Sequence, residues 1–117
     1  MNKPLAGSSI ALLLGLLLVP MSASADDIGK TSYDTYCATC HGATGGGDGT
    51  AGASLEPKPA NFSDAKFWAT RDDALVTKAI KEGGAAIGKS PMMIAWGAVL
   101  DDAKIAAVVK HLKTFKK

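Results

Sequence analysis

This chain is short of cysteine and histidine and has no strong imbalance of charge. Its 117 residues include only two cysteines and two histidines, with 13 basic and 11 acidic side chains. A balance so close to neutral does not indicate nucleic-acid binding or strong electrostatic steering. No internal repeat and no strand-like segment stands out, so every recognisable element is helical or loop. The sequence therefore predicts one small all-α domain.

Both cysteines and one histidine gather in the motif Cys37-Ala38-Thr39-Cys40-His41. Two thiols on one helical turn can each add to a vinyl group of haem, and the imidazole of His41 can then bind the iron. A thiol–disulfide redox centre would need a strand before Cys37, and a zinc site would need the distant His111 as its fourth ligand. The motif therefore predicts one haem c, bound covalently through Cys37 and Cys40, with His41 as an axial ligand.

Residues 1 to 25 have the pattern of a secretory signal. Lys3 supplies a charged start, Leu5 to Val19 an uncharged apolar stretch, and Ala23-Ser24-Ala25 a small-residue cleavage site. The apolar stretch is short for a membrane span, although an uncleaved anchor is the alternative. We expect cleavage after Ala25, which leaves residues 26–117 as the domain, without a membrane span, in the periplasm.

Three helices are predicted from apolar spacing and capping residues. The first covers Ile28 to Thr39, and the second covers Asp72 to Glu82 behind a capping box that starts at Thr70. The last follows Asp101 as its cap and has the clearest amphipathic stripe. That stripe consists of Ile105, Val108, Val109 and Leu112.

Two irregular segments separate the motif from the second helix. Six glycines between residues 42 and 52 lack the Gly-Lys-Ser/Thr ending of a phosphate-binding loop, and we expect them to pass close to the flat ring. Residues 55–61 contain Pro57 and Pro59, which favour an extended connection. One backbone carbonyl of this segment is expected to accept a hydrogen bond from His41 and so orient the imidazole.

A haem bound by one histidine requires an account of the sixth iron position. Met92 and Met93 lie in a loop between two helices, and a thioether ligand stabilises ferrous iron. A methionine can equally serve as core filler. The residues alone therefore leave the sixth ligand open between these two methionines.

Three features together resemble the class I, soluble monohaem cytochrome c family, over Asp26 to Lys117. They are Gly29, Tyr33 and Cys37 at spacings of four, the segment from Ser90 to Gly97, and Leu100-Asp101-Asp102 at the start of the last helix. The resemblance implies helices packed around one haem, with the first and last helices crossing. It further implies that Gly29 allows the close approach and that Tyr33 packs near Val108 and His111.

The resemblance also implies a distal ligand. The ligand methionine of the family's Met-Pro-Ala-Phe/Trp-Gly loop aligns with Met93, which we therefore prefer to Met92. Ile94 stands where relatives usually have proline, and Thr50 stands where many have proline. His111, at a position that is commonly tyrosine, is a weak rival ligand because it belongs to the helix crossing.

Several further residues are expected to contact the haem. The indole N–H of Trp68 is a candidate donor to a haem propionate, and Trp96 is expected to line the pocket. A simple core role is the alternative for both tryptophans. Candidates for the haem wall are Leu55, Phe62, Phe67 and Ile80.

The implied function is one-electron transfer between a donor and an acceptor protein, with no substrate transformed. The protein would be a monomer that docks transiently, and its iron would be the only metal. Two alternatives are a redox subunit held by one dehydrogenase or oxidase complex, and a sensor with an open iron. Four lysines either surround a docking patch or are simply solvated, namely Lys58, Lys66, Lys81 and Lys89.

Overall fold

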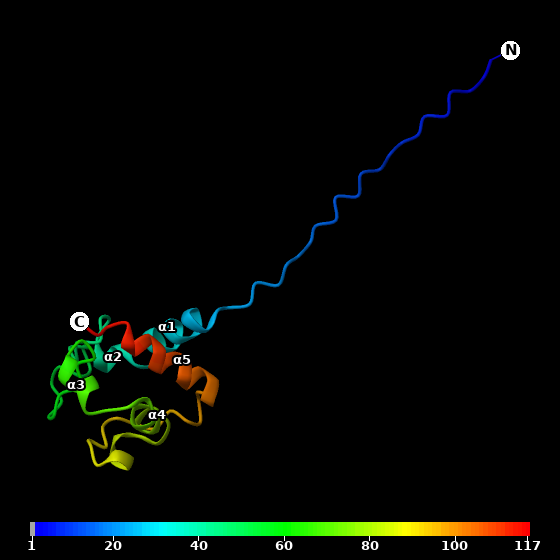
Figure 1. Cartoon of the computed structure of the whole chain (residues 1–117). Helices are drawn as coiled ribbons and strands as arrows, with labels where there is room; N and C mark the ends of the chain where they lie inside the picture. Colours follow the sequence, from blue (N-terminus) through cyan, green and yellow to red (C-terminus); the bar gives the residue numbers. More distant parts are fainter. Residues whose placement is uncertain (1) are drawn as a thin grey trace.

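The computed structural model describes residues 2–117, and all regular structure in them is helical, as the sequence predicts (Figure 1). Its elements are α1 (Ala25–Tyr36), α2 (Ala38–His41), α3 (Ala65–Ala69), α4 (Asp73–Glu82), the 3-10 helix η1 (Gly84–Ile87) and α5 (Asp102–Lys113). Residues 2–24 form an extended arm that leads away from this body. Within residues 2–117 there is no helix both long and apolar enough to span a membrane.

The helices α1 and α5 cross in close contact, as the family resemblance predicts. A Cβ atom built on Gly29 would lie only 2.2 Å from the carbonyl oxygen of Ala107, so only glycine permits this approach. Tyr33, Ile105 and Val108 are completely buried here. The predicted stripe on α5 is buried along its whole length, which confirms the sequence-based interpretation of this helix.

The first helix differs from the prediction at both ends. Its cap is Ser24, whose side chain accepts a hydrogen bond from the backbone N–H of Asp27, so α1 begins three residues earlier than expected. Asp26 and Asp27 in the first turn favour this start, because acidic side chains stabilise a helix N-terminus. The helix then ends at Tyr36, and Cys37 separates it from the short α2.

The capping of α4 also differs from the prediction. The cap is Asp72, whose carboxylate accepts from the N–H of Leu75 at 2.8 Å. The hydroxyl of Thr70 instead donates to carbonyl oxygens of α3, a five-residue helix that the sequence analysis did not find. Asp101 caps α5 as predicted, because its carboxylate accepts from the N–H of Lys104.

The glycine loop, residues 42–53, packs on the backbone of α2. Cβ atoms added at Gly49 and Gly52 would lie 2.3 Å from the Thr39 oxygen and 2.2 Å from the Cys40 oxygen. None of its glycines lines either cavity described below. These glycines thus allow close contact with the motif's own backbone, and the predicted passage of the loop beside the ring stays a prediction.

The methionine loop, residues 88–100, is held against α4 and η1 by backbone hydrogen bonds. The N–H of Trp96 donates to Ile80 at 2.8 Å, and the N–H of Gly84 donates to the Met93 carbonyl at 2.8 Å. In Figure 1 this segment, yellow to orange, runs beside α4 and leads into α5. These bonds fix Met93 relative to α4.

Candidate haem-binding site

A large cavity of about 760 Å³ lies between the motif, the proline segment (residues 55–61), α4 and the methionine loop. Cys40 and His41 come from the motif, and Val76, Ala79 and Ile80 come from α4. Most of its walls are apolar. Further apolar residues on its walls include Leu55, Pro57, Pro59, Ala60, Phe62, Phe67, Leu75, Ile87, Pro91, Met92, Met93 and Leu112.

The imidazole of His41 is fixed by one hydrogen bond and one aromatic neighbour. Its Nδ1 lies 3.1 Å from the carbonyl oxygen of Ala60, and its ring stacks on Phe62 with centroids 4.7 Å apart. A proton on Nδ1 for this bond leaves the lone pair on Nε2, the nitrogen that can bind a metal. The acceptor Ala60 belongs to the proline segment. The hydrogen bond therefore forms although Thr50 stands where many relatives have proline.

Burial lowers the pKa of His41, and the hydrogen bond to Ala60 opposes this only in part. The neutral imidazole, which is the form that binds iron, is therefore favoured at neutral pH. The environment of His41 suits an iron ligand.

The two cysteines are free thiols. Cys37 is buried, and burial together with the nearby Cys40 raises its pKa to about 11. Both line a smaller cavity of about 140 Å³, and Cys40 and His41 border the larger cavity as well. The thiols and the imidazole therefore border connected space, as a haem bound through all three requires.

Both methionines line the two cavities, but their exposure differs. Met92 is 61% exposed, whereas Met93 is half-buried and packs against the hydrophobic core. Gly84 lies directly against this loop, because a Cβ there would be 2.2 Å from the Ser90 oxygen and 3.1 Å from the Met93 Cβ. The structure thus brings Met93 and His41 to one cavity from two distant parts of the sequence.

The remaining predicted contacts divide into three groups. Leu55 lines the larger cavity, and Trp96 lines the smaller one. Trp68 lines neither, and its indole N–H donates to the Phe62 carbonyl at 2.8 Å. Because that donor is already used inside the protein, the geometry supports the core role of Trp68 and not the propionate bond.

His111 lines neither cavity. Its ring lies 5.3 Å from that of Tyr33 and 5.0 Å from that of Phe115, centroid to centroid. Burial lowers its pKa, Asp34 raises it and Lys30 lowers it further. His111 therefore belongs to the α1–α5 crossing and is not placed to bind the iron.

Arg71 is a residue of the cavity wall that the sequence analysis missed. Its guanidinium carbon lies 4.6 Å from the ring centroid of Phe67. Within residues 2–117 no carboxylate lies within salt-bridge distance of it. In the sequence Arg71 is marked only by its position just before the Asp72 cap. Its place on the cavity wall could not be predicted, because the cavity forms from distant segments.

The residues present fit a covalently bound haem. An apolar cavity holds the ring, two thiols and an imidazole border it, and a thioether reaches it from another segment. Arg71 adds a positive charge to the cavity wall. A haem propionate beside an apolar wall needs such a charge nearby.

A comparison with protein families agrees with this geometry. The family model described as cytochrome c matches residues 27–116. The chain belongs to the cytochrome c family. Members of this family bind haem c covalently, so the cofactor predicted from the Cys-x-x-Cys-His motif is confirmed.

Individual relatives add detail on the fold and the setting. This cytochrome is 29% identical over 112 residues to the Cbb3-type cytochrome c oxidase subunit CcoP of Azospirillum brasilense. The aligned region covers 96% of this chain and 36% of that protein. Its fold is similar to the KustC0563 c-type cytochrome, with a TM-score of 0.60 and 28% identity over 76% of this chain and 98% of that one. It is also similar to a chain of the Kuenenia stuttgartiensis reducing HAO-like protein complex Kustc0457/Kustc0458, with a TM-score of 0.63 and 30% identity over 82% of this chain and 46% of that one. The chain thus spans about a third of the curated relative.

Proposed function

We propose that this cytochrome is a periplasmic carrier of single electrons between protein partners, with His41 and Met93 as the axial ligands of its haem. The observation that carries the proposal is that both side chains line one apolar cavity. With both as ligands, no iron position would be free for a substrate. Membership of the cytochrome c family supports electron transfer as the general function. We further propose that no substrate is transformed.

Each motif residue has a separate part in this function. The thiols of Cys37 and Cys40 would hold the haem as thioethers, each S–H adding across one vinyl double bond. The Ala60 carbonyl orients His41 and increases its basicity as a ligand. The iron of the bound haem supplies one-electron chemistry by changing between the ferric and ferrous states.

Met93 and Arg71 set the conditions for that chemistry. The thioether of Met93 is a soft ligand that stabilises the ferrous state and so raises the reduction potential. Arg71 is placed to balance the negative charge of a propionate at the cavity wall. Leu55 and Trp96 contribute apolar surface that excludes water from the ring.

The choice of Met93 is tested by paired substitutions in the exported protein. Met93→Ala should remove the weak ferric charge-transfer band of sulfur–iron ligation and let the ferrous protein bind carbon monoxide at neutral pH. Met92 has an exposed side chain, so Met92→Ala should keep the band and the ferrous protein should not bind carbon monoxide. The reverse pattern would make Met92 the ligand, and carbon monoxide binding by the unmodified protein would favour the open-iron sensor instead.

A redox subunit of a larger complex is a second candidate, and two comparisons favour it. CcoP is an oxidase subunit, and the Kustc0457/Kustc0458 chain belongs to a protein complex. A carrier should elute at the size of a monomer from native periplasmic extract, whereas a subunit should co-elute with a larger assembly.

Export and cleavage after Ala25 belong to the same proposal. Cleavage after Ala25 removes the extended arm of residues 2–24, including the Ser24 cap, and the first residue of α1. None of these residues lines a cavity, so the cavities keep their walls. N-terminal sequencing of the haem-containing protein should begin at Asp26. A sequence that begins at Met1 in a membrane fraction would indicate a retained anchor.

A further inference from the structure

Gly84, the first residue of η1, is buried and lies on the wall of the larger cavity beside the methionine loop. Its N–H donates to the Met93 carbonyl at 2.8 Å, and its carbonyl accepts from the Lys89 N–H at 2.9 Å. This one residue therefore binds the methionine loop at two points, one on each side of Ser90.

The Cα atom of Gly84 also lies against the loop, with no space for a side chain. A Cβ there would lie 2.2 Å from the Ser90 carbonyl oxygen and 3.1 Å from the Met93 Cβ. The φ angle of Gly84 is not in the left-handed region, so a side chain is excluded by the contact and not by the backbone conformation. We refer to this contact and the two hydrogen bonds as the Gly84 clasp.

The clasp acts on the turn of the loop that contains Met93. The Ser90 carbonyl accepts from the Met93 N–H at 3.3 Å, so a displacement of Ser90 is passed on to Met93. The loop is attached again at Trp96, whose N–H donates to a carbonyl of α4. Between these attachments little burial holds the loop, since 56% of Ile94 is exposed. The position of Met93 therefore depends on the Gly84 clasp.

We propose that Gly84 is a positioning residue that keeps the sixth iron position closed to foreign ligands, because it holds the Met93 turn against the body. This inference rests on the proposed function, in which Met93 is the distal ligand. A foreign ligand binds only in molecules whose Met93 has left the iron, so its apparent affinity falls with the fraction of such molecules. The clasp keeps that fraction small, as an electron carrier requires.

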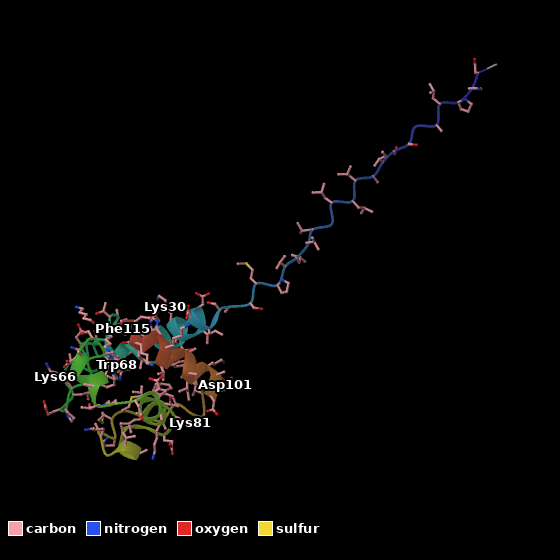
Figure 2. The ribbon with its side chains drawn as sticks, viewed as in Figure 1. Lys30, Lys66, Trp68, Lys81, Asp101 and Phe115 are labelled. Carbon is pink, nitrogen blue, oxygen red and sulfur yellow. The ribbon has the colours of Figure 1, made fainter. Side chains whose placement is uncertain are left out.

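Gly29 provides a matched control for Gly84. A Cβ at either glycine would lie 2.2 Å from a backbone carbonyl oxygen of another segment, and neither glycine has a left-handed φ. The two sites lie in different parts of the body. In Figure 2, Lys30, the neighbour of Gly29, and Lys81, three residues before Gly84, lie well apart. The same added methyl group therefore disturbs either the crossing or the clasp.

The probe is imidazole added to the ferric protein. Its nitrogen lone pair replaces the sulfur lone pair of Met93, without transfer of an electron or a proton, and the loss of the sulfur–iron charge-transfer band measures this exchange. Gly84→Ala should bind imidazole about tenfold to a hundredfold more tightly than the unmodified protein, because the overpacked loop leaves the iron more easily. Gly29→Ala should be destabilised as well but should bind imidazole like the unmodified protein. If Gly84→Ala does not bind imidazole more tightly than Gly29→Ala, the proposal is overturned.

A second measurement needs no variant. Imidazole bound to the unmodified ferric protein should accelerate hydrogen exchange at the N–H groups of Gly84 and Lys89, because the clasp opens when Met93 leaves. The N–H of Val109, in the buried stripe of α5, should keep its exchange rate. Unchanged exchange at Gly84 and Lys89 would show that Met93 leaves without opening the clasp, which would also overturn the proposal.

The same spectra separate a failure of this inference from a failure of the proposed function. If Met93→Ala keeps the charge-transfer band, the proposed distal ligand is wrong, and the inference about Gly84 is wrong with it. If the band requires Met93 but imidazole binds equally to Gly84→Ala and Gly29→Ala, the ligand is correct and only the clasp is refuted.

Discussion

At the α1–α5 crossing the protein fills its own interior, whereas between α4 and the methionine loop it leaves a cavity of about 760 Å³. The crossing is so tight that Gly29 meets the Ala107 carbonyl without space for a methyl group. The cavity is bordered by apolar side chains that would otherwise face water. The difference indicates that the polypeptide alone completes the core at the crossing, whereas the haem completes it between α4 and the methionine loop.

The largest expected effect comes from removing the covalent attachment. Cys37→Ala/Cys40→Ala should lose haem to acidic acetone and lose on the order of 5 kcal/mol of stability, comparable to the whole free energy of unfolding of a small domain. Circular dichroism during guanidinium unfolding is the measurement. A cooperative transition at the position of the unmodified protein would show that the cavity half of the core does not depend on the attached haem.

A smaller effect is expected at the crossing itself. Gly29→Ala places a methyl group against the backbone of α5 and should cost about 2–3 kcal/mol of unfolding free energy, as overpacking does. Thr31→Ala, at an exposed site on the same helix, is the matched control and should change little. If both variants unfold at the same guanidinium concentration, the crossing is looser than the structure indicates. The haem spectrum should be unchanged in both variants.

Tyr33 joins the two regions and should show an intermediate effect. Its hydroxyl donates to the Gly42 carbonyl at 2.6 Å, directly after the motif, while its ring lies in the crossing. Tyr33→Phe removes this bond and leaves the Gly42 carbonyl only its 3.2 Å bond from the Gly45 N–H, so it should cost about 1 kcal/mol, again measured by guanidinium unfolding. A loss below a few tenths of a kcal/mol would mean that water replaces the hydroxyl.

The smallest expected effect is a pH dependence at the crossing. Burial lowers the pKa of His111 in the folded state below its ordinary value of 6.5. Below pH 6.5 the unfolded chain therefore binds more protons at this residue than the folded chain does. Stability should therefore fall as pH decreases from above 6.5 toward the folded-state pKa. His111→Tyr keeps an aromatic ring beside Tyr33 and Phe115 and should reduce this fall. Unfolding curves at pH 8 and pH 5 compare the two proteins, and parallel pH profiles would exclude His111 as the source.

The sequence sufficed where the information is local or strongly periodic. The motif places its chemistry within five residues, the α5 stripe from Ile105 to Leu112 repeats over about two turns, and Gly29 marks the close approach. The five-residue α3 is too short to show a period, and the break at Cys37 follows no breaking residue.

Other features arise only from the packed chain. The placement of Arg71 on the cavity wall and the use of the Trp68 donor by Phe62 depend on segments meeting in space. The smaller cavity combines Tyr36 at the end of α1 with residues far along the chain, so no sequence window contains it. The contact of the glycine loop with α2 could not be predicted, because it leaves no pattern in the sequence.

The central claim is that Cys37 and Cys40 bind one haem covalently and that this haem completes the core. The most direct measurement is acidic acetone extraction of protein produced with a haem attachment pathway, followed by the visible spectrum of the polypeptide. The account predicts that the pigment stays with the polypeptide, and that it is extracted after Cys37→Ala/Cys40→Ala. Pigment that passes into the acetone from the unmodified protein would contradict the account.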